Sequence, residues 1–187
     1  WALVGGNGVG KTTLLRTLLG ISQVNPRPAA SGRLLTDRIG YLDQRLALDD
    51  AKSAFELVSG AAPQRLPHDT YEGLARFLLR GDAIHRPART LSGGERFRVA
   101  LARVLLAVPP PELLVLDEPT NNLDLDSVDQ LVDALGSYRG ALIIVSHDRH
   151  LLSRLGLDRI LDLSPDGTLR PSEIGASPSP ESPPMYR

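Results

Sequence analysis

The 187-residue chain contains no cysteine, and this absence excludes several kinds of site at once. Without thiols there can be no disulfide, no thiolate-bound zinc or iron–sulfur centre and no cysteine nucleophile. Lysine is nearly absent as well, since only Lys11 and Lys52 occur among 21 basic residues. The 22 acidic residues bring the net charge to −1, which argues against a domain that binds nucleic acid through bulk positive charge.

Aromatic residues and long hydrophobic runs are also scarce. Aromatic residues make up 4% of the chain, so its core must be mostly aliphatic. No apolar run approaches the roughly 18 residues that cross a bilayer. We therefore expect a cytoplasmic protein without direct membrane insertion, and its length fits one domain with a substantial core.

The two ends of the chain differ from the part between them. A strand predicted at Ala2–Val4 has almost nothing before it, which indicates a fragment that lacks its first strands. Residues 171–187 are rich in proline and serine and predict a disordered tail after a domain at 1–170.

Between these ends, short apolar runs alternate with amphipathic stretches. This order predicts an α/β fold with a mostly parallel sheet, whose sites lie at the carboxyl ends of the strands. Strands are predicted at Ala2–Val4, Arg38–Leu42, Leu113–Leu116, Leu142–Val145, Arg159–Leu163 and Thr168–Arg170, the last two forming a hairpin. Helices are predicted at Lys11–Leu19, Ala51–Ser59, His68–Leu79, Gly94–Ala107 and Ser127–Leu135, with a loop at Asn25–Gly32.

A glycine-rich segment between the first strand and the first helix predicts a phosphate site. Residues 5–12 fit the pattern G-x-x-x-x-G-K-[ST], in which backbone N–H groups point at phosphate oxygens. Lys11 adds a compact cation, and the Thr12 hydroxyl can ligate Mg²⁺. The alternative is a plain glycine turn, but a lysine at this position of an arginine-rich chain argues against it. The predicted binding residues are Gly5, Gly6, Asn7, Gly8, Val9, Gly10, Lys11, Thr12 and Thr13.

Two acidic residues close the apolar run Leu113–Leu116. At this strand end, Asp117 would face Mg²⁺ directly or through water, and Glu118 would act as the general base toward an attacking water. A strand that simply meets solvent with two acids is the alternative. The phosphate loop upstream in the same chain favours the catalytic interpretation.

A second glycine-rich helix start lies at Leu91-Ser92-Gly93-Gly94-Glu95. Ser92 is a good N-cap, and the two glycines leave N–H groups open to an anion. A plain capping box would explain Ser92 and Glu95 but not both glycines. The chain therefore carries two anion-binding helix starts, one more than a single nucleotide requires within one domain.

Taken together and in this order, the motifs resemble those of the ATP-binding cassette (ABC) ATPases, over residues 1 to about 163. The resemblance implies a P-loop NTPase fold with an inserted helical subdomain at about 45–107, and ATP and Mg²⁺ as ligands. It also implies a second cassette that packs head to tail, so that Ser92, Gly93 and Gly94 bind the partner's nucleotide in trans. Within this resemblance Gln44 would contact the metal and the attacking water, His147 would contact the γ-phosphate, and residues 122–124 would cross the dimer interface.

Charge is distributed in two opposed blocks. Residues 76–103 carry seven arginines against two acids, and residues 112–133 carry seven acids and no base. A basic block thus leads into the second glycine-rich helix start, and an acidic block surrounds the predicted metal site. Two solvated faces of mixed charge would explain most individual residues equally well.

Within this family, less specific features of the sequence resemble the ABC-F proteins. These are soluble twin-cassette ATPases that typically act on the ribosome in translation or antibiotic resistance. Residues 117–127, residues 39–44 and Glu95 resemble that group, and the 46 residues between Gln44 and Leu91 leave no room for an added arm or coiled coil. The spacing indicates the C-terminal cassette, with an absent linker as the ribosome contact. A transporter ATPase that docks on a permease is the alternative hypothesis, and an inactive binding module is the third.

Overall fold

The computed structural model describes residues 1–21, 34–121 and 123–173. Their strands form one six-stranded sheet in the order β2-β3-β4-β1-β5-β6. The first five are parallel, and β5 and β6 form an antiparallel hairpin, as predicted. The strands span Ala2–Val4 (β1), Ile39–Leu42 (β2), Leu113–Asp117 (β3), Ala141–Val145 (β4), Ile160–Leu163 (β5) and Leu169–Ser172 (β6).

Alternate residues of the strands face opposite sides of the sheet, as the two-residue period of a strand requires. Leu114, Leu116 and Ile144 belong to a large buried cluster that includes residues of the helices α2 to α6. Their neighbours Val115 and Val145 join a smaller cluster whose helical members come from α1. The helices span Lys11–Leu18 (α1), Ala54–Ala61 (α2), Pro67–Arg76 (α3), Gly93–Leu105 (α4), Leu125–Ser137 (α5) and Arg149–Arg154 (α6), with 3₁₀ turns at Gly81–Ile84 (η1) and Ala88–Thr90 (η2).

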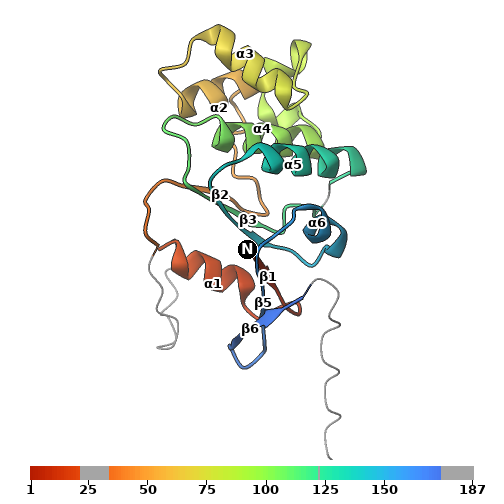
Figure 1. The fold of residues 1–187 in the computed structure, drawn as a ribbon. Coiled ribbons are helices and arrows are strands. Elements are labelled where there is room, and N and C mark those ends of the chain that lie inside the picture. Colours follow the sequence, from red (N-terminus) through yellow and green to blue (C-terminus); the bar gives the residue numbers. More distant parts are fainter. Residues whose placement is uncertain (22–33, 122, 174–187) are drawn as a thin grey trace, which may run out of the picture.

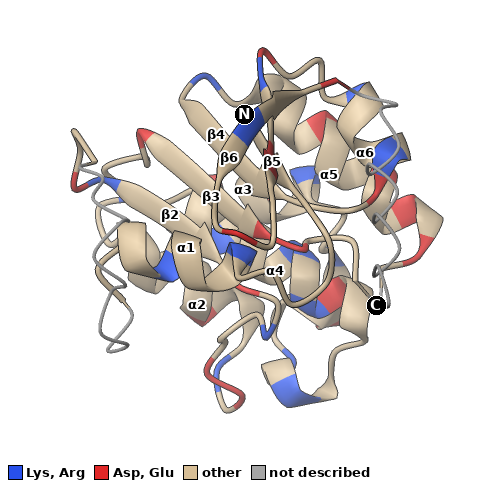
Figure 2. Cartoon of the chain, turned by 90° about the horizontal axis from the view of Figure 1, so that it is seen from below, with Lys and Arg blue, Asp and Glu red and all other residues tan. Residues whose placement is uncertain are grey.

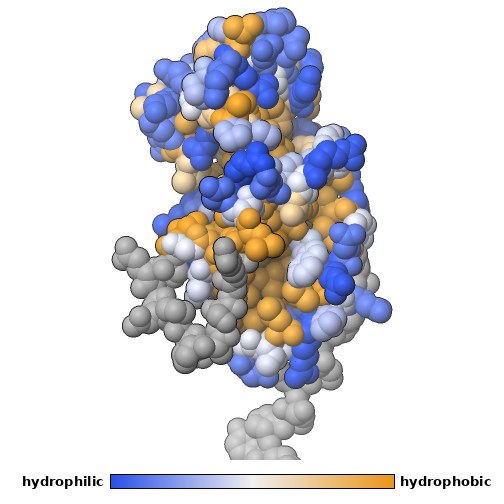
Figure 3. Space-filling view, turned by 60° about the vertical axis from the view of Figure 1, so that its left-hand side comes forward, coloured by the Kyte–Doolittle hydropathy of each residue, from blue (hydrophilic) through white to orange (hydrophobic). Residues whose placement is uncertain are grey.

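The segment between β2 and β3 forms a helical layer at one end of the sheet (Figure 1). Within it α2 packs against α3 and α4, and α4 also contacts β2. Figure 3 shows mostly hydrophilic residues on this part, whereas hydrophobic residues gather on the body beside the grey trace. Leu14, Ile39 and Ile143 are half-buried members of the smaller cluster on the α1 side of the sheet. The α1 side of the sheet is therefore less completely covered than the other side within the described residues.

Most helices and strands differ from their predicted bounds by one to three residues, and one helix lies outside the predictions. The helix predicted from Ala51 begins at Ala54, because Ser53 caps it and exchanges hydrogen bonds with Glu56. The helix α6 was not predicted; its six residues are too few to show a clear periodicity. Strand β6 continues to Ser172, two residues into the predicted tail. Residues 174–187 and the predicted loop Asn25–Gly32 lie outside the described residues.

Candidate active site

The loop between β1 and α1 needs its glycines for conformation and for space. Gly5, Gly8 and Gly10 have φ values of 141°, 78° and 103°, which side chains rarely adopt. A Cβ added at Gly5 would lie 2.6 Å from the carbonyl oxygen of Leu163. The loop therefore depends on these glycines whether or not a ligand is bound.

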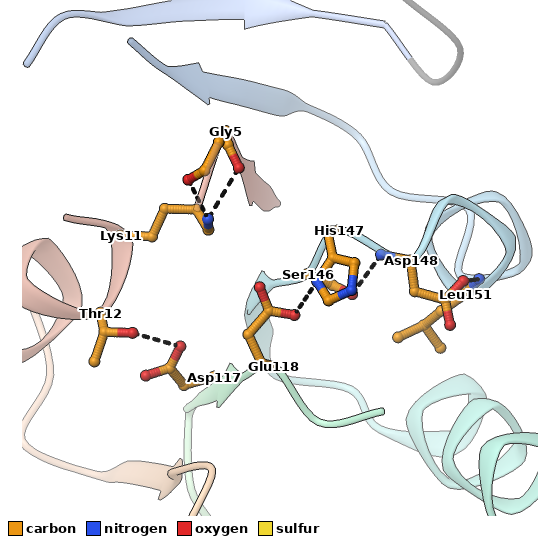
Figure 4. Close-up of polar contacts among 10 residues, drawn as sticks. Gly5, Lys11, Thr12, Asp117, Glu118, Ser146, His147, Asp148 and Leu151 are labelled. Atoms are coloured by element: carbon orange, nitrogen blue, oxygen red, sulfur yellow. Dashed lines mark hydrogen bonds and ion pairs between the residues drawn. The ribbon is translucent and has the colours of Figure 1, made fainter. Parts of the chain in front are cut away.

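Lys11 is folded back over this loop rather than extended into solvent. Its side chain is buried, and Nζ donates to the carbonyl oxygens of Gly5 and Gly6 at 2.9 and 3.0 Å (Figure 4). These contacts hold the ammonium group beside the loop where a phosphate would enter. The lysine of the predicted phosphate site is thus already positioned without a ligand.

Thr12 and Asp117, which are predicted to bind the metal, lie in separate elements and are hydrogen-bonded to each other. The Thr12 hydroxyl, at the start of α1, donates to Oδ1 of Asp117 at 3.1 Å. Asp117 ends β3 and is only 3% exposed. One hydroxyl and one carboxylate fit Mg²⁺, which keeps several waters and takes phosphate oxygens rather than a full set of protein ligands. No group of three or more His, Asp or Glu residues that could hold a metal occurs in the described ranges.

Glu118 lies directly after β3 in a left-handed backbone conformation with φ of 50°. Such a conformation costs about 1–3 kcal/mol for a residue with a side chain and persists only where surrounding contacts impose it. Here the Glu118 N–H donates to the carbonyl of Val145 at 2.8 Å. Oε2 of Glu118 lies 2.9 Å from Nδ1 of His147, which follows β4. The two residues predicted to serve the attacking water and the γ-phosphate are therefore in direct contact.

Ser146 and Asp148 flank His147 and form local hydrogen bonds that the sequence pattern did not single out. Ser146 is fully buried, and its hydroxyl accepts the N–H of Asp148 at 3.0 Å. Asp148 in turn caps α6 by accepting the N–H of Leu151 at 3.0 Å. The signal was present as a serine and a good N-cap residue on either side of the histidine.

These elements enclose a cavity of about 550 Å³ at the carboxyl ends of the parallel strands. This volume lies within the roughly 300–1,000 Å³ of small-molecule sites. Gln44, which follows β2, reaches the cavity with the loop residues, Glu118 and His147. Asn121 also lines it and was not predicted. The full lining is Asn7, Gly8, Gly10, Lys11, Thr12, Thr13, Gln44, Glu118, Asn121 and His147.

The second glycine-rich start does not line this cavity. Ser92 caps α4 in a complete capping box: its hydroxyl accepts the Glu95 N–H at 3.2 Å, and its N–H donates to Oε2 of Glu95 at 2.8 Å. The N–H of Ser92 is the main reason that the pKa of Glu95 is lowered. Ser92 and Gly93 are nevertheless exposed. The capping box is therefore part of an exposed glycine turn that lies outside this chain's own cavity.

The charged blocks are partly neutralised within the fold. In Figure 2 the strands are mostly uncharged, and acidic and basic residues lie at strand ends and on helices and loops. Arg86 pairs with Glu95, and Arg96 pairs with Asp50.

No helix of the described ranges is long and apolar enough to cross a membrane.

Comparisons with known proteins point to one family. The family model described as "ABC transporter" matches residues 1–121. The chain is 40% identical over 164 residues to the putative ATP-binding protein YdiF of Bacillus subtilis. The aligned segment covers 87% of this chain and 25% of that protein. It is 39% identical over 153 residues to ATP-binding cassette sub-family F member 3 of Pongo abelii, covering 80% of this chain and 21% of that protein. The chain thus spans about a quarter of the length of these relatives.

Two solved structures resemble the fold. One is an inward-facing putative metal-chelate type ABC transporter, with a TM-score of 0.73, 26% identity and coverage of 92% of this chain and 71% of that chain. The other is the ATP-binding cassette MJ0796 in a dimeric post-hydrolysis state bound to ADP and Pi, with a TM-score of 0.72 and 21% identity. It covers 94% of this chain and 85% of that chain. Both likenesses agree with the predicted P-loop NTPase fold.

Proposed function

Because the chain belongs to the ATP-binding cassette family, we propose that it is one cassette of a twin-cassette ABC-F ATPase that acts on the ribosome. The curated relatives at about 40% identity support the ABC-F assignment. Their fourfold greater length supports a second cassette within one polypeptide or in a partner. The observation that carries the catalytic part is the cavity in which Lys11, Thr12 and Glu118 converge.

In this proposal the glycine loop and Lys11 bind the phosphates of ATP. The N–H groups at the start of α1 point at the oxygens, and the ammonium group exchanges its carbonyl partners for the outer phosphates. Thr12 and Asp117 hold Mg²⁺, which when bound neutralises the charge that develops on the transferred phosphoryl group. The chain contributes the position of both ligands, because α1 and β3 place them within hydrogen-bond distance.

Glu118 acts as the base in the hydrolysis step. It accepts a proton from the attacking water while the water oxygen bonds to the γ-phosphorus and the bond to the ADP oxygen breaks. His147 keeps the carboxylate oriented through its contact with Glu118 and contacts the γ-phosphate once ATP is bound. Gln44 contributes a polar group to the same cavity, toward the water or the metal.

Ser92, Gly93 and Gly94 act on a second nucleotide, held by the partner cassette. Their turn is exposed and does not line this chain's own cavity, which supports a role in trans. The dimeric state of the MJ0796 cassette agrees with such pairing in a protein of the same fold. An ATPase that docks on a permease is the alternative, and the likeness to the metal-chelate type transporter favours it.

Co-sedimentation of the full natural polypeptide with ribosomes, with and without ATP, tests the ribosome assignment. ABC-F function predicts binding that increases with ATP in a variant unable to hydrolyse it. Binding equal with and without ATP, or none, would contradict the assignment. Phosphate release from ATP, measured in parallel, tests the ATPase activity separately.

A further inference from the structure

The helices α4 and α5 touch at their first turns, close to the exposed glycine turn. A Cβ added at Gly94, the second residue of α4, would lie 2.8 Å from Oγ of Ser127 and 3.7 Å from Oδ2 of Asp124. Real Cβ atoms essentially never show a contact as short as the first. Ser127 is fully buried, and its hydroxyl finds no hydrogen-bond partner among the described residues. A side chain at Gly94 would therefore force the Ser127 hydroxyl or one of the two helices to shift, apart from any effect on an anion.

The contact continues one turn further along both helices. Arg98 lies four residues after Gly94, and Gln130 lies three residues after Ser127, so each pair shares one helix face. Nη1 of Arg98 is 3.4 Å from Oε1 of Gln130 and donates to it. We call Gly94, Arg98, Ser127 and Gln130 the α4–α5 seam; the two helices lie side by side in Figure 1.

Both helices of the seam begin at exposed loops. Ser92 and Gly93 are exposed before α4, and Asp124 caps α5 by accepting the Ser127 N–H at 2.8 Å. Leu125, the first residue of α5, is 82% exposed although it is a large hydrophobic residue. Leu125 and the glycine turn are therefore both accessible to a second protein at the starts of two helices in contact.

We propose that the close contact of Gly94 with Ser127 locks these two loops into one rigid unit that is presented to the partner cassette. Ser127 is then a positioning residue for ATP hydrolysis at the partner's site, because it sets where Ser92 and Gly93 lie relative to the loop at Asp124 and Leu125. The inference rests on the proposed action of the glycine turn in trans. It differs from a role of Gly94 in admitting the phosphate, because it requires the side chain of Ser127.

The double variant G94A/S127A separates these two roles. The methyl group of G94A collides with the Ser127 hydroxyl, so we expect turnover to fall by about tenfold or more, as small displacements of catalytic groups do. S127A removes the colliding oxygen and leaves a Cβ at an ordinary contact distance of 4.0 Å. We expect the double variant to turn over faster than G94A, because the collision is removed, and S127A alone to lose less than G94A.

The measurement is phosphate release by the full natural polypeptide, with kcat and KM determined separately. The lock acts on the partner's site, so binding of ATP to this cassette's own loop should stay unchanged in all three variants. G136A is the matched control, because Gly136 lies in α5 with nothing within 4 Å of an added Cβ. S127T adds a methyl group from the α5 side of the same contact and should lower turnover if G94A does not fold.

Three results would overturn the inference. A double variant as slow as G94A would assign Gly94 to the anion alone, and wild-type turnover in both G94A and S127T would show that the contact is not tight. Weaker binding of ATP at this cassette's own loop would show a general structural defect. Phosphate release that is equal in the wild type and in K11A would instead contradict the proposed function.

Discussion

Oε2 of Glu118 lies 2.9 Å from Nδ1 of His147, although the two residues follow different strands and are 29 positions apart. Glu118 reaches this contact through a left-handed backbone, and its side chain is only 14% exposed. His147 is 62% exposed and lies between Ser146 and Asp148, which are hydrogen-bonded to each other. The contact therefore joins a strained, largely buried carboxylate to an exposed imidazole at the wall of the cavity.

The substitution E118Q should abolish hydrolysis but keep ATP binding. The amide retains the size and one oxygen of the carboxylate but cannot accept the proton of water, so turnover should fall by about 10²–10⁴-fold. Steady-state phosphate release and equilibrium binding of a fluorescent ATP analogue measure the two effects. Near wild-type turnover would exclude Glu118 as the base.

The substitution K11A should lower ATP binding, because it removes the one cation that the loop holds against Gly5 and Gly6. K11R should not restore it, since the flat guanidinium group does not fit the buried position of a compact ammonium group. K52A is the matched control, because Lys52 is exposed and pairs with Asp49 away from the cavity. Equal loss in K11A and K52A would contradict a specific phosphate contact.

The substitution G5A should destabilise the fold even without nucleotide. An added Cβ would lie 2.6 Å from a backbone oxygen that cannot move aside, and φ of 141° is unfavourable for alanine. We expect a loss of about 1–3 kcal/mol in the free energy of unfolding, as for other strained positions. Urea denaturation measures it, with G60A in α2, where an added Cβ has open space, as the control. A loss seen only in the presence of ATP would assign Gly5 to the ligand instead.

The site residues that sequence analysis identified are those whose chemistry depends on a short local pattern. The glycine loop, Asp117 and Glu118 lie at the ends of strands whose apolar runs are unmistakable, so their convergence follows from a parallel sheet. The contact of Glu118 with His147 depends on the registry of β3 with β4, which pairs Asp117 with Val145. Local patterns carry no information about that registry.

The packing of Gly94 against Ser127 was equally hidden from the sequence. The sequence indicates only an anion-binding role for Gly94. The helix α5, whose Ser127 lies close to Gly94, begins 31 residues later. Asn121 lines the cavity because the chain turns after Glu118, where the Asn121 N–H donates to the Glu118 carbonyl at 3.3 Å. Pro119 at the second position of this turn is a turn signal, but it does not show that the turn faces the cavity. Contacts between elements that are distant in sequence require the packed structure.

The glycine turn at Ser92 predicts that ATP hydrolysis depends on pairing of cassettes. If the chain is assayed alone, phosphate release per molecule should be low and should rise with protein concentration, because each site needs the turn of another copy. G93D places a carboxylate where a phosphate would bind and should remove that rise while ATP binding stays intact. High turnover that is independent of concentration would contradict action in trans.

The capping box of α4 predicts a pH dependence of stability. The backbone N–H of Ser92, as the largest contribution, lowers the pKa of Glu95 below its usual value of 4.5. The folded state therefore favours the ionised carboxylate, and this contribution is complete above the unfolded pKa and is lost as pH falls through the lowered folded pKa. The stability difference between wild type and E95Q, from urea titrations, should be constant from neutral pH down to about 5 and shrink below about 4.5.

The capping box of α2 offers an independent case in E56Q, since Ser53 lowers the pKa of Glu56 in the same way. A difference that stays constant down to pH 3 would show that the ionised carboxylate does not stabilise the cap.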